Sequence, residues 1–243
     1  GAKMRLDPPD SYWKKDVALF LGRRLSLAIK MLYPAAIILP VAASGIPAQY
    51  AAAVVGLVAI MAGTFGAGES LTNDINDGIL VRVALTPLSP YRIVAEILVV
   101  NAALDFLQLL PALAGVYLLH PAPPAWVLAA TVAVFATLLT ANAIGVLLAN
   151  FTSSPADVLL YATIVLFPLI YLSGFFRNQH PEGLLAALRH LVPFAYMNDA
   201  LKEIFGLATA ASPLAVILVP TLLGALTAAA VCLTAPRLLS PRL

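Results

Sequence analysis

The sequence predicts an all-α membrane protein that crosses the bilayer with six transmembrane helices. Three observations predict it: the composition, the length of the apolar runs, and the distribution of lysine and arginine between the loops. Of the 243 residues, 61% are hydrophobic and only 11% are charged, whereas about a quarter of the residues in soluble domains are charged. The mean hydropathy is +0.94. This composition disfavours the alternative, a soluble helical domain with a large core.

The apolar runs define the expected spans. A bilayer core of about 30 Å requires about 20 mostly apolar helical residues. Six runs meet this requirement, at about 25–43, 50–68, 93–119, 125–150, 156–176 and 212–234. Several contain a proline, which spanning helices tolerate because neighbouring groups satisfy the freed carbonyls. We therefore expect kinks in these helices and no breaks.

The basic residues predict the orientation, because cytoplasmic loops carry an excess of lysine and arginine. Six spans place both termini on the same side. That side then holds Lys3, Arg5, Lys14, Lys15, Arg23, Arg24, Arg82, Arg92, Arg237 and Arg242. The other side holds only Arg177, Arg189 and Lys202. Both termini are therefore predicted to be cytoplasmic.

The segment before the first span predicts an amphipathic helix over residues 10–23. Trp13, Val17 and Phe20 fall on one face, with lysines elsewhere. This pattern is typical of a helix that lies at the membrane interface. An ordinary cytoplasmic extension is the alternative.

The segment between the fifth and sixth spans, residues 177–206, is predicted on the external side. It is too apolar for a plain loop, and Pro193 divides it into two short helical stretches. Helices this short cannot span the bilayer, so we expect two external re-entrant helices that enter it partway.

The sequence lacks the patterns that indicate several kinds of chemistry. The phosphate-binding pattern G-x-x-x-x-G-K-[ST] and the nucleophile pattern G-x-S-x-G do not occur. The three histidines, His120, His180 and His190, lack the spacing of a metal site. The sequence therefore predicts neither a catalytic residue nor a metal site, and a net charge of +2 gives no indication of nucleic-acid binding.

The third span carries a polar stripe. Asn101, Asp105 and Gln108 are spaced i, i+4 and i+7 and share one helical face. A carboxylate in the middle of a span costs on the order of 3 kcal/mol, so Asp105 should face protein or water. Two alternatives remain open: a translocation path or subunit interface, and a structural aspartate that packs against another helix.

A polar stretch, "NDINDGILVRVALTPLSPYR", interrupts the apolar runs between the second and third spans. We predict a short cytoplasmic helix over residues 73–85, capped by Asn73 or Asp74. Thr86-Pro87 should end it, because the residue before a proline avoids the α region. Gly78 would leave room for a partner surface. A solvated loop is the alternative.

Three segments resemble the permease subunit of ABC-2-type transporters. In "NDGILVRVALTPLS", the glycine, the Thr-Pro pair and the following serine have the spacing of the family's first cytoplasmic loop. "NFTSSPAD" resembles the family's short loop before the fifth span. The most specific segment is "YLSGFFRNQHPEGLLAALRHLVPFAYMNDALKEIFG", after that span. Two positions depart from the family: acidic and amide residues replace its arginine–glutamate pairs before Gly78, and Ile79 replaces a threonine.

The resemblance implies the membrane permease subunit of an ATP-driven ABC exporter, located in the cell membrane. This chain would be a transport subunit and not an enzyme by itself. A second permease, identical or different, would complete the translocation path, and separate nucleotide-binding subunits would bind ATP and magnesium. The chain itself would need no cofactor. The cargo is expected to be a drug-like, lipid-like or glycan-linked amphipathic molecule. Two alternatives are a stand-alone secondary transporter or channel that uses Asp105, and an integral-membrane enzyme or assembly protein.

The resemblance also implies residue roles. ATPase coupling is expected of Asn73, Asp74, Asp77, Gly78, Ile79, Arg82, Val83 and Pro87. An external gate is expected of Ser173, Gly174, Phe175, Pro193, Tyr196 and Asp199. The stripe of Asn101, Asp105 and Gln108 would line the path or the subunit interface.

Overall fold

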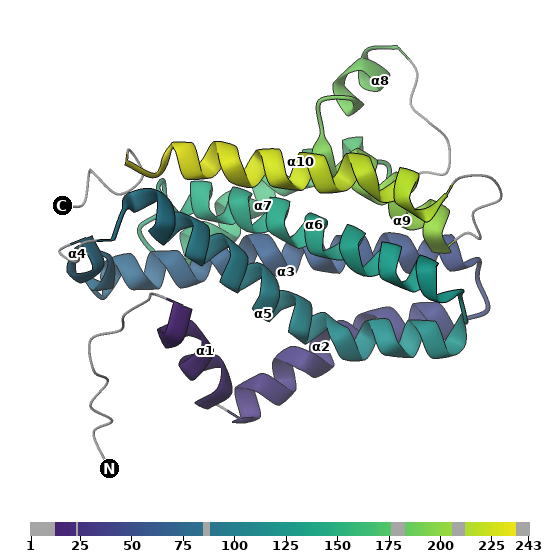
Figure 1. Ribbon diagram of the computed structural model, residues 1–243, viewed down its shortest axis with the longest axis horizontal. Helices are drawn as coiled ribbons and strands as arrows, with labels where there is room; N and C mark the ends of the chain where they lie inside the picture. The colour runs from purple at the N-terminus through teal and green to yellow at the C-terminus, as the bar shows by residue number, and fades with distance from the viewer. Residues whose placement is uncertain (1–12, 23, 85–87, 176–182, 206–211, 237–243) are drawn as a thin grey trace.

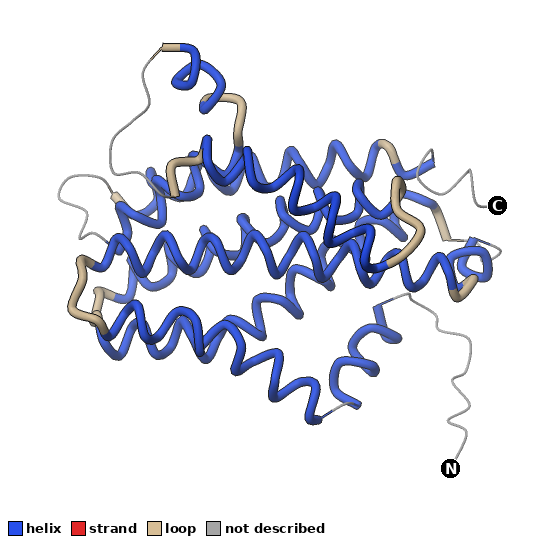
Figure 2. Tube along the Cα trace, turned by 180° about the vertical axis from the view of Figure 1, so that it is seen from behind, coloured by secondary structure: helices blue, strands red, loops and turns tan. Residues whose placement is uncertain are grey.

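The computed structural model describes residues 13–22, 24–84, 88–175, 183–205 and 212–236. Within these ranges the chain is helical, without strands, as Figures 1 and 2 show. The helices are α1 (Trp13–Gly22), α2 (Arg24–Ala43), α3 (Ala48–Asn76), α4 (Ile79–Ala84), α5 (Pro90–Leu119), α6 (Pro124–Ala149), α7 (Pro155–Leu172), α8 (Leu184–Arg189), α9 (Pro193–Phe205) and α10 (Pro213–Leu233). The predicted all-α class is confirmed.

Five of these helices, α3, α5, α6, α7 and α10, are long and apolar enough to cross a membrane. The first predicted span lies in α2, whose apolar part is the shorter stretch Leu27–Ala43. The six-span arrangement therefore stays a prediction, while a multi-pass membrane protein is established. The internal prolines of α2, α5, α7 and α10 lie within continuous helices, as expected.

Serine followed by proline begins three of the long helices. Ser89, Ser154 and Ser212 each accept a hydrogen bond from a backbone N–H of the first turn, and a proline follows each of them. The serine hydroxyl accepts a hydrogen bond from a backbone N–H of the first turn that has no partner within the helix. Proline at the first position has no N–H that would need a partner. Local sequence thus fixes where α5, α7 and α10 start.

The centre of the bundle is the contact between α3 and α6. A Cβ atom on Gly145 would lie 2.4 Å from the carbonyl oxygen of Thr64, so the two backbones touch. The Thr64 hydroxyl donates to the carbonyl of Ala141 at 3.1 Å. Small residues allow this close approach between membrane helices. In their most apolar stretches, α3 and α6 are each 67% buried, against 22% in α7 and α10.

Two of the short helices, α4 and α8, lie at the margins of the bundle. Figure 1 shows α4 at one end, beyond α3 and α5, and α8 projecting from the bundle. Helix α9 is amphipathic and buries Phe194, Met197 and Leu201. It therefore packs on the long helices as part of the core.

Candidate functional site

The polar stretch between α3 and α5 does not form the single helix that was predicted. Helix α3 continues to Asn76, and a separate helix, α4, begins at Ile79. The expected start at Asn73 is therefore wrong. The reason is Gly78, whose φ of +67° places it in the left-handed region, a conformation that glycine adopts at helix C-termini without a steric cost. Residues 85–87, with the predicted stop and Pro87, lie outside the described residues.

The turn gives Gly78 a role within the chain itself. Nothing lies within 4 Å of the position a Cβ would occupy there. The backbone N–H of Asp77 donates to the carbonyl of Asn73 at 2.9 Å, and that of Gly78 donates to Ile75 at 3.1 Å. The left-handed turn itself therefore favours glycine at this position, and the approach of a partner surface to Gly78 stays a prediction.

Helix α4 has a buried face and an exposed face. Leu80 and Val83 are buried with residues of α3, α5 and α10, whereas Val81 and Arg82 are exposed. Of the expected coupling residues, Val83 thus faces inward and Ile79 is half-buried. Asp74, in the last turns of α3, is also buried, while Asn73 and Asp77 are exposed. Among the described residues of this corner, the exposed ones are therefore Asn73, Asn76, Asp77, Val81 and Arg82.

The end of α3 is tied to the loop between α6 and α7. The hydroxyl oxygens of Thr72 and Thr152 lie 3.1 Å apart. Asn76 donates from Nδ2 to the carbonyl of Ser153 at 3.1 Å. Neither contact was predictable from the sequence, because single polar residues at span ends carry no signal of their own.

The polar stripe of α5 meets a partner on α6. Asn142 donates from Nδ2 to Oδ2 of Asp105 at 3.0 Å. Gln108 lies at the limit of a hydrogen bond, with Nε2 3.5 Å from Oδ1 of the same carboxyl group. Asn101 is also buried, and its side-chain nitrogen has no hydrogen-bond partner within the described ranges. The signal for Asn142 was present as a lone amide in the middle of the fourth apolar run.

Asp105 lies inside the subunit. It is 8% exposed, and a Cβ on Gly66 of α3 would lie 3.3 Å from its Oδ1. The carboxyl group is thus enclosed by α3, α5 and α6 of one chain. This position favours the packing alternative over a path between subunits.

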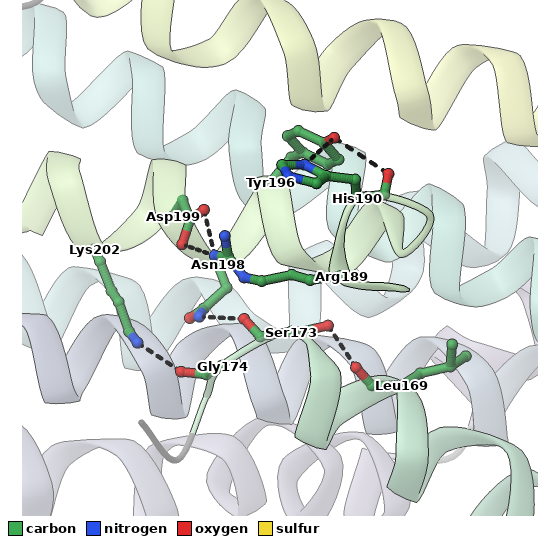
Figure 3. A network of polar contacts seen from close by, with 9 residues as sticks. All are labelled: Leu169, Ser173, Gly174, Arg189, His190, Tyr196, Asn198, Asp199 and Lys202. Carbon is green, nitrogen blue, oxygen red and sulfur yellow. Dashed lines mark hydrogen bonds and ion pairs between the residues drawn. The ribbon is translucent and has the colours of Figure 1, made fainter. Parts of the chain in front are cut away.

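The end of α7 is joined to α9 by two hydrogen bonds to backbone carbonyls, as Figure 3 shows. Asn198 donates from Nδ2 to the carbonyl of Ser173 at 3.0 Å. Lys202 donates from Nζ to the carbonyl of Gly174 at 2.8 Å. Gly174 has a φ of +77°, so the chain can turn there. Burial lowers the pKa of Lys202, and the nearby Asp199 carboxylate partly opposes this effect.

Helix α8 is held to α9 by side chains of the same network. Arg189 forms an ion pair with Asp199, and the Tyr196 hydroxyl donates to the carbonyl of His190 at 3.2 Å. The structure has two short helices here, the second starting at Pro193, and their external, re-entrant placement stays a prediction; residues 176–182 and 206 lie outside the described ranges. Ser173, Gly174, Tyr196 and Asp199 meet in this network, which also includes the unpredicted Arg189, Asn198 and Lys202.

Phe175 has a different position from the other expected gate residues. It is 7% exposed and packs in the apolar core. A Cβ on Gly56 of α3 would lie 2.7 Å from its ring. Phe175 therefore anchors the end of α7 against α3. In the described ranges no group of three histidine, cysteine, aspartate or glutamate residues could hold a metal ion.

The architecture defines the class of the protein: a helical, multi-pass membrane protein with a polar corner at one end and a polar helical network after its fifth predicted span. The chain matches the ABC-2 type transporter family over residues 11–205. It belongs to this family, and it is an ABC transporter permease, a transport component. No curated protein matches the chain.

Proposed function

We propose that this permease is one subunit of an ATP-driven exporter, and that α4 receives the movement of a separate ATPase subunit. The observation that carries the proposal is the division of α4 into two faces. Leu80 and Val83 are buried in the apolar cluster that contains residues of α3 and α5, and α4 packs against α3, while Val81 and Arg82 face outward. A short helix packed against the end of a long helix can transmit a force applied to its free face.

The sequence supports the division of labour in this proposal. It contains no phosphate-binding pattern G-x-x-x-x-G-K-[ST], so ATP and magnesium would be bound by the partner subunits. A second permease, identical or different, would complete the path. Large apolar side chains on α7 and α10, such as Phe167 and Leu226, are 70% and 64% exposed, and would face lipid or that second permease. The cargo would be an amphipathic molecule, and the complex would reside in the cell membrane.

The position of Asp105 weakens the alternative of a stand-alone secondary transporter or channel. Such a mechanism needs an ionisable group that opens to a path. Asp105 is enclosed by three helices and accepts a hydrogen bond from Asn142. This geometry supports a structural role.

The test is charge reversal on the exposed face of α4. The permease is purified in mild detergent from the cells that make it. Two quantities are then measured: the amount of a co-purifying subunit that has a phosphate-binding loop, and the ATPase activity of the preparation. Arg82→Glu should leave the permease in the membrane at the parental level but lose the ATPase subunit. Glu203→Lys, a reversal at an exposed position of α9, is the matched control and should retain it. If Arg82→Glu retains the subunit and its activity, α4 is not the docking element.

A further inference from the structure

The inner end of α7 is attached to the α3–α4 corner by buried contacts. The hydroxyls of Thr72 and Thr152 are 3.1 Å apart, and the two residues are 1% and 6% exposed. The Thr152 hydroxyl also donates to the carbonyl of Ala149 at 3.3 Å, so Thr72 serves as the donor to Thr152. Together with the bond from Asn76 to Ser153, this pair ties the last turns of α3 to the loop that enters α7.

That loop continues into α7 without a flexible joint. Ser154 and Asp157 form a reciprocal capping box, in which the Ser154 hydroxyl accepts from the Asp157 N–H at 3.2 Å and Asp157 Oδ2 accepts from the Ser154 N–H at 3.0 Å. The same carboxylate accepts from the N–H of Ser153 at 3.3 Å. Such a box fixes the first turn of a helix. The next residue, Val158, lies against Gly68 of α3. A displacement of Thr72 is therefore passed on to the start of α7.

The outer end of α7 is attached to α9, through the bonds of Asn198 and Lys202 to the carbonyls of Ser173 and Gly174 shown in Figure 3. Between its ends α7 packs on the bundle along one face only, through Ala162 and Leu166, and 22% of its length is buried. Leu160, Ile164 and Phe167 point away from the core and are 59–70% exposed. A helix that is held at both ends and packed along one face can move as a rod.

We propose that α7 relays movement of the α3–α4 corner to α8 and α9, with Thr72 and Thr152 as the positioning pair that fixes its inner end. The proposal rests on the proposed function, since it requires an ATPase subunit that moves α4. It adds a second element, far from α4 in sequence, through which nucleotide-driven movement reaches the opposite end of the protein.

The experiment uses two reporter cysteines in a Cys232→Ala background, in the permease purified with its ATPase subunit and reconstituted in nanodiscs. Tyr91→Cys reports on the inner end of α5, and Leu184→Cys reports on α8; these side chains are 49% and 76% exposed. The rate of maleimide labelling is measured without nucleotide and with ATP plus vanadate. The test variants are Thr72→Val, Thr152→Val and the double variant, which remove hydroxyls and keep the side-chain shape.

The controls separate a positioning role from a general structural one. Thr163→Val removes a hydroxyl that bonds only within α7, to the carbonyl of Leu159, and should behave as the parent. Thr152→Ser keeps the hydroxyl and should also behave as the parent. Because Thr72 and Thr152 share one hydrogen bond, the effects of the two single valine variants should not add in the double variant.

The expected result is a nucleotide-dependent change at both reporters in the parent. In the valine variants the change at Tyr91→Cys should persist, and the change at Leu184→Cys should fall about fivefold, as expected for the loss of one hydrogen bond. An undiminished change at Leu184→Cys, or an equal loss at both reporters, overturns the relay and leaves the proposed function standing. No nucleotide-dependent change at Tyr91→Cys in the parent overturns the proposed function, and the relay with it.

Discussion

Asn142 on α6 hydrogen-bonds both to Asp105 on α5 and to the backbone of α6. Its Nδ2 donates both to Oδ2 of Asp105 at 3.0 Å and to the carbonyl of Leu138 at 2.9 Å. Asp105 and Asn142 are 8% and 0% exposed. An ionisable group inside a span requires such a partner, because an unsatisfied buried polar group is costly.

The first prediction concerns this pair. Asn142→Leu should destabilise the permease by about 1–3 kcal/mol, because it leaves the Asp105 carboxyl group without its main donor. Replacing both residues, as in Asp105→Leu with Asn142→Leu, should restore most of the loss, since no polar group is then left unpaired. Thermal denaturation followed by size-exclusion chromatography measures both. Asn73→Leu, at an exposed position, is the control.

The same pair distinguishes packing from transport. Asp105→Asn keeps an acceptor for Asn142 and should therefore be mild in both stability and transport. A variant that is stable and assembled but transports poorly would place Asp105 on the substrate path and contradict the packing role.

The second prediction concerns the contact between α3 and α6. Gly145→Ala should destabilise the protein by about 1–3 kcal/mol, the usual range for overpacking a core, because the new Cβ would lie 2.4 Å from the Thr64 carbonyl oxygen. Gly22→Ala is the matched control, since nothing lies within 4 Å of that position. Equal thermal midpoints for the two variants would show that the helices separate at little cost.

The third prediction tests why the turn before α4 contains glycine. Asparagine adopts the left-handed conformation more readily than β-branched residues do. Gly78→Asn should therefore retain the ATPase subunit, whereas Gly78→Val should weaken its retention by displacing α4. The measurement is the amount of ATPase subunit that co-purifies with each variant. Loss of the subunit with both variants would instead support a close approach of the partner to Gly78.

The fourth prediction concerns the number of spans. With six spans, cysteines introduced by Asp7→Cys and Pro241→Cys, in a Cys232→Ala background, should resist membrane-impermeant thiol reagents in intact cells. They should react after the cells are opened, which is the control for accessibility. Labelling of only one end in intact cells would show an odd number of spans, with α2 as the helix that fails to cross.

The fold was predictable because its main determinants are local. Apolar runs of sufficient length predict spanning helices, and the structure has long helices at the later five. The boundary between α3 and α4 was not predictable from capping preference. Asn73 and Asp74 are good helix caps, yet they continue α3. The conformation of Gly78 determines the boundary, and a glycine in a sequence does not reveal its own φ angle.

The candidate site was predictable only where one partner of a contact is conspicuous. Asp105 stands out in an apolar span, but its partner is 37 residues away on another helix, and no local pattern connects the two. The hydrogen bonds of Asn198 and Lys202 were even harder to predict from the sequence. Their acceptors are backbone carbonyls, which every residue possesses, so the sequence cannot single them out.

Because α3 is long, a small tilt of this helix would move the corner at α4 over a large distance. With 29 residues and a rise of about 1.5 Å per residue, α3 is about 43 Å long, whereas the hydrocarbon core is about 30 Å thick. Its polar last two turns, residues 69–76, follow the apolar run and extend about 12 Å. In the proposed orientation these two turns would carry α4 beyond the hydrocarbon core, as the end of a lever arm. A tilt of α3 by about 10° around its midpoint would move that end by about 4 Å, a displacement comparable to the spacing between packed atoms.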